Sequence, residues 1–499
     1  MSSIRRQSIV SSILVYFGFA LGFFNTYLFT RQGGFSEAQY GLTGTFIAIA
    51  NIMFSVASLG MPAFIGKFFP YYNSHLTTGK NDMATWALLI PCVGFLFVIA
   101  AGVGFKNILI DKVFNNSPEL LQYYYWLFPF GFGLTLFVVL EAYAWQQRKA
   151  ILSNFLKEVL FRIFITVLIV LTTYQVISGF DAFIKLYAFL YILLALVLII
   201  YLFRTKKLSF VFSVSKVTKR FFRKILALVS FTWAGGLVFT IASVFDTIVL
   251  AAVLPNGMAV AGIFVLAQNI SSLIQAPQRG IISASIGPLS QAWKEKNYEK
   301  INKIYQRSSI NQLIFSCAMF CLIWLNFEDG INTFNLKPSY LQAMYPFFFI
   351  GLTRIIDMGT GVNSQIIGTS VFWRFEFVTG LVLLSLALPL NYIITRQLGV
   401  VGPAISNLIA FTIYNLLRYL FLLRKFSMQP FTIKSLYTVL LAGFCYYVCY
   451  LLFSQQTGFL WIVLRSTFFS ILFVTGAITL KLSPDVKPVL ESVQNRLRL

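Results

Sequence analysis

The sequence predicts an all-α integral membrane protein with about 14 transmembrane helices. Hydrophobic residues make up 58% of the chain and charged residues 11%, a composition that excludes an ordinary soluble domain. Runs of about 20 apolar residues recur along the chain, and each is long enough to cross a bilayer as a helix. Six runs in the first half reappear in the same order about 218 residues later. Two parallel six-helix bundles followed by two further helices account for these observations.

The first bundle is predicted over residues 1–204 and the second over 225–425. The apolar runs of the first bundle lie near residues 9–30, 40–61, 84–104, 120–146, 155–174 and 183–203. Those of the second lie near 227–253, 260–283, 309–326, 340–366, 373–394 and 401–423. Because six is an even number, both bundles would cross the membrane in the same orientation. Carriers with parallel repeats follow this plan, with a substrate site between the halves.

The remaining segments are a linker, two helices and a tail. The linker is predicted over 205–224. The segment from Arg204 to Lys224 contains eight Lys and Arg interleaved with Phe and Val, which suits either an interfacial helix in the headgroup layer or a plain inner loop. Apolar runs near 435–453 and 459–480 predict two extra transmembrane helices over 426–481. The tail over 482–499 alternates apolar with charged residues, which predicts a short amphipathic cytoplasmic helix.

The net charge of +23 invites a nucleic-acid partner, but its distribution argues against one. Predicted inner connections and both termini hold 28 of the Lys and Arg residues, whereas predicted outer loops hold 6. This bias follows the positive-inside rule and places both termini in the cytoplasm. The basic residues also favour contact with anionic membrane lipid.

No enzyme motif is present. The five cysteines all lie in predicted spans, and the chain has a single histidine, so we expect the cysteines to pack rather than bind a metal. There is no phosphate-binding glycine loop and no nucleophile-elbow spacing. The outer loops are too short for a catalytic domain. The sequence therefore predicts a protein that is not an enzyme and needs no cofactor.

Polar residues inside the predicted spans form the candidate site. A charge near the bilayer centre costs roughly 2.5–3.5 kcal/mol, so such residues are functional candidates by default. We expect them to line a wet substrate cavity. The candidates are Asn25, Asp246, Gln268, Asn269, Gln275, Arg279, Arg354, Asp357 and Asn363.

The charged candidates admit more than one interpretation. Arg354 and Asp357 are three residues apart on one helix, so they could neutralise each other or line the cavity. Arg279 has no acid one turn away and is the better candidate for a ligand-facing cation. The pairs Glu158/Arg162 and Arg374/Glu376 lie near inner ends of spans, where interfacial anchoring is the simpler role.

Several motifs resemble the O-antigen-type polysaccharide flippases of the multidrug/oligosaccharidyl-lipid/polysaccharide (MOP) exporter superfamily. The segment from Phe24 to Pro70 is similar to their first two helices, with a Ser-Glu-Ala-Gln-Tyr-Gly turn and an Ala-Ser-Leu-Gly-Met-Pro exit. Asp246 within Phe-Asp-Thr-Ile-Val-Leu resembles their aspartate-bearing helix seven. The run from Val260 to Gln268 resembles helix eight, and Pro-Leu-Ser-Gln-Ala-Trp from Pro288 fits as well. The resemblance extends over nearly the whole chain.

The resemblance implies a membrane transporter of the bacterial inner membrane. Such a protein flips polyprenyl-diphosphate-linked oligosaccharide from the inner to the outer leaflet by alternating access, for polysaccharide biosynthesis. The implied partners are this lipid-linked oligosaccharide, membrane lipid and other polysaccharide assembly proteins. Cationic cavities are typical of the family, and Arg279 and Arg354 are the candidates here.

Two other functions remain open. The first is a proton- or sodium-coupled exporter of cationic drugs from the same superfamily, although such carriers usually have about twelve spans and acids in the cavity. The second is a membrane-embedded envelope glycan enzyme or assembly factor, which the short loops disfavour.

Overall fold

The computed structural model describes residues 3–109 and 114–485. This part of the chain is helical and contains no β-strand, so the predicted all-α class is confirmed. Most of the predicted tail over 482–499 lies outside the described residues. By their internal contacts, the residues form two compact units, Met1–Gly262 and Ile263–Leu499, named unit 1 and unit 2 below.

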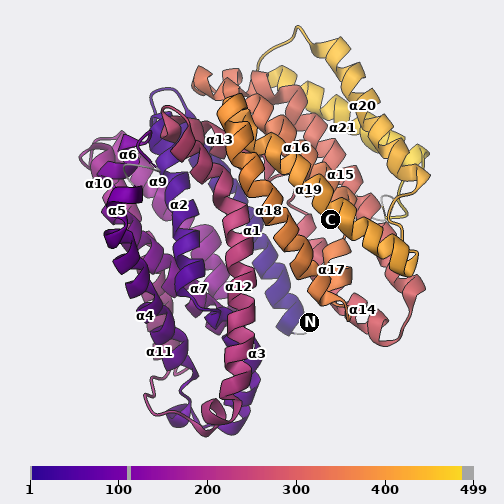
Figure 1. The fold of residues 1–499 in the computed structure, drawn as a ribbon. Helices are drawn as coiled ribbons and strands as arrows, with labels where there is room; N and C mark the ends of the chain where they lie inside the picture. Colours follow the sequence, from indigo (N-terminus) through magenta and orange to yellow (C-terminus); the bar gives the residue numbers. More distant parts are fainter. Residues whose placement is uncertain (1–2, 110–113, 486–499) are drawn as a thin grey trace. The chain divides into compact units, whose positions relative to one another are not determined.

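Unit 1 contains α1 to α12 and the first part of α13 (Figure 1). The helices are α1 (Ser3–Thr30), α2 (Glu37–Ala57), α3 (Met61–His75), α4 (Met83–Gly104), α5 (Lys106–Ile108), α6 (Pro118–Gln122), α7 (Leu127–Gln146), α8 (Ala150–Asn154), α9 (Phe161–Thr173), α10 (Gly179–Ala188), α11 (Leu190–Arg204), α12 (Lys216–Val253) and α13 (Gly257–Ser271). A π-helical turn, η4 (Phe155–Leu160), joins α8 to α9.

Unit 2 contains the rest of α13 and the helices α14 to α21. These are α14 (Gln278–Lys294), α15 (Tyr298–Thr333), α16 (Met344–Gly359), α17 (Asn363–Gly368), α18 (Trp373–Leu398), α19 (Gly402–Phe426), α20 (Ile433–Phe453) and α21 (Phe459–Thr479).

Nine helical segments of the described residues are long and apolar enough to cross a membrane. Two shorter apolar helices, Leu14–Thr30 and Gly257–Ser271, accompany them. The chain is therefore a multi-pass membrane protein, and the total of 14 spans stays a prediction. The contact boundary falls inside α13, and α12 packs on α2 and α3. Contacts alone do not identify repeats, so the predicted bundle boundaries also stay predictions.

The start of α2 follows directly from its sequence. Ser36 is the N-cap, its hydroxyl accepts from the Gln39 N–H at 3.1 Å, and the Gln39 amide oxygen accepts from the Ser36 N–H at 2.9 Å. This reciprocal capping box satisfies two of the N–H groups that a helix start leaves open. The chain then turns from α2 into α3 at Gly60, whose φ of 74° is left-handed and suits glycine.

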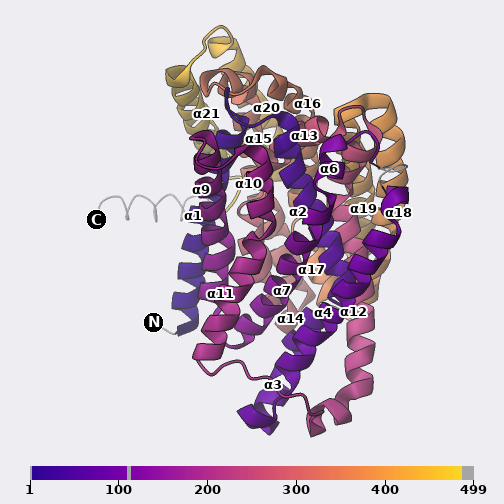
Figure 2. The same cartoon turned by 90° about the vertical axis from the view of Figure 1, so that its left-hand side faces the viewer.

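The core of unit 1 surrounds α7, which contacts α2, α3, α4 and α11 (Figure 2). Aromatic rings fill this core. Phe130 stacks on Tyr187 with ring centroids 4.9 Å apart, and Phe161 stacks on Tyr191 at 4.5 Å. Such offset stacks add to the free energy of apolar burial, so α7 is the central helix of this unit.

The predicted linker over 205–224 changes from coil to helix at Lys216, where α12 begins. With 38 residues, α12 is roughly 57 Å long, well beyond the hydrocarbon thickness of about 30 Å. Asp82 fixes its start: one carboxylate oxygen accepts from the Ser215 N–H at 2.9 Å, the Thr218 hydroxyl at 2.8 Å and the Trp86 indole at 3.1 Å. The segment is a coil up to Ser215, and from Lys216 it is a helix continuous with the span that follows. The choice between an interfacial helix and an inner loop stays a prediction.

In unit 2, α20 and α21 pack against α15 (Figure 1). A buried ion pair joins α21 to α15. An Arg465 guanidinium nitrogen lies 3.0 Å from an Asp329 carboxylate oxygen, and both side chains are 7% exposed. Cysteines of α15 and α20 lie buried as free thiols: Cys317, Cys321, Cys445 and Cys449. No group of three or more His, Cys, Asp or Glu able to hold a metal occurs within residues 3–109 and 114–485.

Candidate functional site

A broken helix creates the candidate site in unit 2. Helix α16 ends at Gly359, and the chain turns through Gly361 before α17 begins at Asn363. Gly361 has a φ of 64°, and an added Cβ would approach the Ser308 hydroxyl to 2.8 Å. Glycine is required there both by the left-handed backbone and by the close neighbour. Broken helices at membrane depth expose backbone and side-chain polar groups where a site can form.

Asp357, in the last turn of α16, receives hydrogen bonds from two other helices. Its carboxylate oxygens accept from the Gln278 amide of α14 at 2.9 Å and from the Asn415 amide of α19 at 3.3 Å. The Asn415 carbonyl in turn accepts from the Thr360 hydroxyl at 3.0 Å and the Asn363 amide at 3.1 Å. Asn415 thus connects the broken helix to α19.

One turn further along α19, the buried Arg418 forms an ion pair with Glu376 of α18, whose side chain is partly exposed. Arg418 is 3% exposed, and its guanidinium carbon lies 3.6 Å from the centre of the Tyr414 ring. Ser364 of α17 donates to the same Glu376 oxygen at 2.6 Å. A buried charge pair is tolerated when further hydrogen bonds satisfy it.

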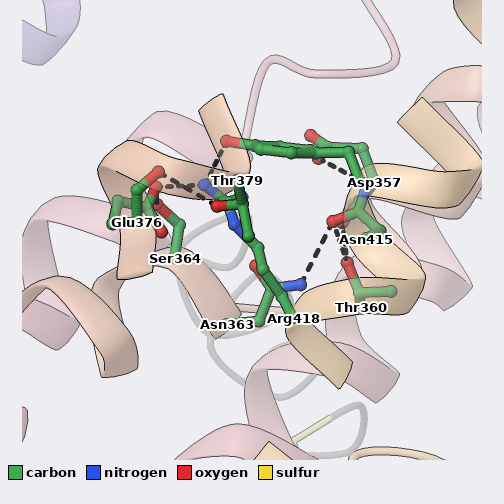
Figure 3. A network of polar contacts seen from close by, with 9 residues as sticks. Asp357, Thr360, Asn363, Ser364, Glu376, Thr379, Asn415 and Arg418 are labelled. Atoms are coloured by element: carbon green, nitrogen blue, oxygen red, sulfur yellow. Dashed lines mark hydrogen bonds and ion pairs between the residues drawn. The ribbon is translucent and has the colours of Figure 1, made fainter. Parts of the chain in front are cut away.

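Together these side chains form one polar network over α14, α16, α17, α18 and α19, most of which is drawn in Figure 3. Two of its buried atoms, Glu376 Oε2 and Arg418 Nε, have no hydrogen-bond partner in the described part of the chain. Buried polar atoms normally find a partner, and an orphan calls for an explanation such as a ligand or water. The network therefore has unused hydrogen-bonding capacity on both a carboxylate and a guanidinium.

Two of the predicted site residues, Asp357 and Asn363, belong to this network, linked through Asn415. Arg279 lies in the first turn of α14 and is exposed, next to Gln278, which contacts Asp357. Arg354 lies one turn before Asp357 on α16 and is half-buried.

The other predicted residues lie elsewhere. Asn25 is buried in unit 1, where its amide donates to the Arg162 carbonyl at 2.9 Å and accepts from the Thr166 hydroxyl at 2.6 Å, so it ties α1 to α9. Asp246 is buried in α12 of unit 1. The remaining three are half-buried in and just after α13: Gln268, Asn269 and Gln275.

The role of α19 was not predicted from the sequence. Glu376, for which interfacial anchoring was the simpler interpretation, pairs with the buried Arg418. Neither Arg418 nor Asn415 was a candidate. The available signal was that Arg418 is a lone cation within an apolar run, which cannot stay buried without a partner.

A second charged cluster lies on α7, η4 and α9 of unit 1. Glu141 of α7 is 4% exposed and lies 3.2 Å from the Lys157 ammonium of η4. Glu158 and Arg162 form an ion pair at 3.2 Å one helical turn apart. Arg162 packs against Gly18 of α1, where a Cβ would clash with its guanidinium at 2.5 Å. The Lys157–Glu141 pair thus joins η4 to α7, whereas the Glu158–Arg162 pair lies within one helical run, with side chains 16% and 25% exposed.

Comparison with known proteins identifies the fold. The solved structure of the lipid II flippase MurJ in an inward closed conformation matches with a TM-score of 0.75 at 18% identity, covering 95% of this chain and 99% of that one. An inward-facing multidrug resistance MATE transporter of the MOP superfamily matches with a TM-score of 0.65 at 15% identity, over 83% and 94%. The chain has the MOP exporter fold.

A third MOP-superfamily transporter, from Pyrococcus furiosus, matches with a TM-score of 0.55 at 16% identity, over 84% of this chain and 95% of that one. No protein-family model and no curated protein sequence matches the chain. The fold is the one that the predicted resemblance to the MOP superfamily implies. These three structures are of one flippase and two transporters.

Proposed function

We propose that the protein is a flippase that moves a polyprenyl-diphosphate-linked oligosaccharide from the inner to the outer leaflet by alternating access. The observation that carries this proposal is the extent of the structural likeness. The flippase structure corresponds to 95% of this chain, whereas the MATE transporter corresponds to 83%. Part of this chain has no counterpart in the drug-exporter structure, whereas nearly all of it has a counterpart in the flippase structure.

The charged residues fit an anionic headgroup. We assign the diphosphate to Arg279 and Arg354, because guanidinium groups bind phosphate oxygens in bidentate geometry. Arg279 is exposed and Arg354 half-buried, so neither is sealed in the core as Arg418 is. We assign the sugar hydroxyls to the network around Asp357, whose carboxylate and amides suit hydroxyl groups.

An anionic substrate also has an energy source. An inside-negative membrane potential drives negative charge outward by roughly 2.3 kcal/mol per charge per 100 mV. We propose that both termini are cytoplasmic and that the membrane is the bacterial inner membrane, as the distribution of basic residues predicts. Other polysaccharide assembly proteins are the expected partners.

Reconstituted protein tests the proposal. We expect proteoliposomes to flip a fluorescent polyprenyl-diphosphate oligosaccharide, and Arg279→Ala and Arg354→Ala each to slow flipping by about tenfold or more, the value of a lost charge-assisted hydrogen bond. Arg424→Ala, at an exposed arginine in the last turn of α19, is the matched control and should flip normally. Full activity in both site variants would refute the cation assignment.

A deletion strain separates the flippase from its rival. Lipid-linked oligosaccharide should accumulate on the inner leaflet, and the wild-type gene should reverse this while Arg279→Ala should not. The rival, a cation-coupled drug exporter, is favoured by the carboxylates Asp357 and Glu376 in the unit 2 network. Unchanged oligosaccharide distribution with altered tolerance to cationic drugs would establish the rival.

A further inference from the structure

We infer that a stripe of basic residues at the start of α12 binds the anionic phospholipid headgroups of the inner leaflet. The stripe consists of the exposed residues Lys216, Lys219, Arg220, Arg223 and Lys224. The inference rests on the orientation proposed above, with the linker on the cytoplasmic side, and is independent of the substrate carried. No carboxylate of the described residues pairs with the five cations.

The spacing of the stripe places all five charges on one face. Counted from Lys216, the others follow at i+3, i+4, i+7 and i+8, which is the periodicity of a single helical face. Five cations on about two and a half turns repel one another unless an anionic partner is present. A polyanionic surface supplies that partner.

The opposite face of the same turns is fixed to α3 and α4. Phe221 packs on Tyr71 and Phe68, with ring centroids 5.1 and 5.8 Å away. Thr218 bonds to the Tyr72 hydroxyl at 2.6 Å and to the buried Asp82 at 2.8 Å. The helix cannot rotate without breaking these contacts, so the direction of the stripe is set by the fold.

The linker before the stripe presents aromatic side chains to its surroundings. Phe212 is 75% exposed, and Phe210 and Val214 are also exposed. The backbone between them is held, since the Val211 N–H donates to Thr85 at 2.7 Å and the Ser215 N–H to Asp82. Fixed, exposed phenyl groups beside exposed cations have the composition of a segment that inserts at a membrane interface.

The length of α12 puts the stripe at the correct depth. From residue 225 to Val253 the helix contains no Lys or Arg and a single acid, the buried Asp246. This segment rises roughly 43 Å, which matches the roughly 40–45 Å of a bilayer with its headgroups. The five cations therefore emerge at the membrane surface. A soluble acidic protein or a nucleic acid would satisfy the charges but leave Phe210 and Phe212 in water, so the lipid surface is the partner that fits both features.

A fluorophore on the linker tests the inference without measuring transport. Phe212→Cys is labelled with a polarity-sensitive dye in a Cys92→Ser background, because the other four native cysteines are buried. The full-length protein is placed in nanodiscs of phosphatidylcholine with increasing phosphatidylglycerol. We expect the emission to shift to the blue as anionic lipid is added. The shift should vanish at about 1 M salt, where the Debye length is about 3 Å.

A charge-matched pair of variants identifies the stripe as the cause. Changing Lys219, Arg220, Arg223 and Lys224 to Gln should abolish the shift over the whole range of phosphatidylglycerol fractions. Each basic residue contributes about a factor of five, so four of them weaken the attraction by about several hundredfold. The control changes Lys294, Lys296, Lys300 and Lys303 to Gln and should behave as wild type. Equal responses of the two variants, or a shift independent of anionic lipid or salt, would overturn the inference.

The alternative ligand of the basic stripe is the diphosphate headgroup of the transported substrate. Inorganic diphosphate added to phosphatidylcholine nanodiscs should not change the emission. A response to diphosphate without a response to phosphatidylglycerol would assign the stripe to the substrate and overturn the lipid assignment. If the Gln variant fails to fold, the salt dependence of the wild type still decides the result. These measurements do not depend on transport, so they would stand even if the protein proved not to be a flippase.

Discussion

At the scale of single residues, the Arg418–Glu376 pair holds the candidate site together. Arg418→Gln would leave the enclosed Glu376 carboxylate without its cation, and a broken buried pair costs about 3–5 kcal/mol. We expect a correspondingly lower thermal transition in detergent. Replacing both partners, as Arg418→Met with Glu376→Gln, should recover much of the loss. Arg424→Gln, at the exposed end of α19, controls for the removal of a charge and should melt as wild type does. Equal losses of thermal stability in Arg418→Gln and Arg424→Gln would contradict a special role for the Arg418–Glu376 pair.

Asp485 provides a pH-dependent contact beyond the last membrane helix. The Arg307 guanidinium donates to its carboxylate, with Nε at 2.9 Å, and lowers the pKa of Asp485 below its ordinary value. A lowered pKa stabilises the folded protein above the unfolded pKa of about 3.9, and this stabilisation is lost as the pH falls through the lower, folded pKa.

We therefore expect the stability difference between wild type and Asp485→Asn to be largest near neutral pH and to disappear in strong acid. Because the Arg307 side chain is 53% exposed, the difference should be below about 1 kcal/mol. Thermal transitions of both proteins across the pH range measure it. A difference that grows on acidification would contradict the assigned sign.

Residue roles were also the hardest feature to predict from sequence. Helical spacing relates residues within one helix, but Glu376 and Arg418 are 42 positions apart, and Asp357 and Asn415 are 58 apart. Their pairing depends on how α16, α18 and α19 pack, which no local pattern encodes. The apolar runs, by contrast, are local signals, and the run near 40–61 corresponds to α2 and the start of α3.

At the scale of helices, the Arg465–Asp329 pair docks α21 onto α15. Asp329 also accepts from the Gly458 N–H between α20 and α21 at 2.9 Å, so one carboxylate holds both the helix and its preceding turn. Asp329→Ala should destabilise the protein by about 3–5 kcal/mol and increase proteolysis between α20 and α21. The neighbouring Glu328→Ala, at an exposed acid, should change neither quantity.

Two glycines set the crossing of α2 and α13 within unit 1. An added Cβ at Gly41 would approach the Met258 carbonyl oxygen to 1.9 Å, and one at Gly262 would approach the Glu37 carbonyl oxygen to 2.1 Å. Even Gly41→Ala must therefore separate the two backbones, and we expect a large loss of stability or of folded yield. Gly66→Ala, where nothing lies within 4 Å, is the matched control. Normal folding of both would show that the crossing is not tight.

At the scale of the whole molecule, the orientation in the membrane can be tested directly. We expect a membrane-impermeant maleimide to label Lys207→Cys only in inside-out vesicles and Tyr174→Cys only in right-side-out vesicles. Both side chains are exposed, so burial would not explain a failure to react. Labelling of both from the same side would refute the predicted orientation.

The π-helical turn η4 in unit 1 has a consequence for tolerated sequence length. A π-turn places one more residue in a turn than an α-helix needs, and here it interrupts an otherwise continuous run of helix from Ala150 to Thr173. Removing one residue between Phe155 and Leu160 would convert that turn to regular helix and leave α9 in register with α1. Elsewhere in a packed helix, the same deletion rotates every following side chain by about 100°. This short segment is therefore where homologues of different length are expected to differ by a single residue.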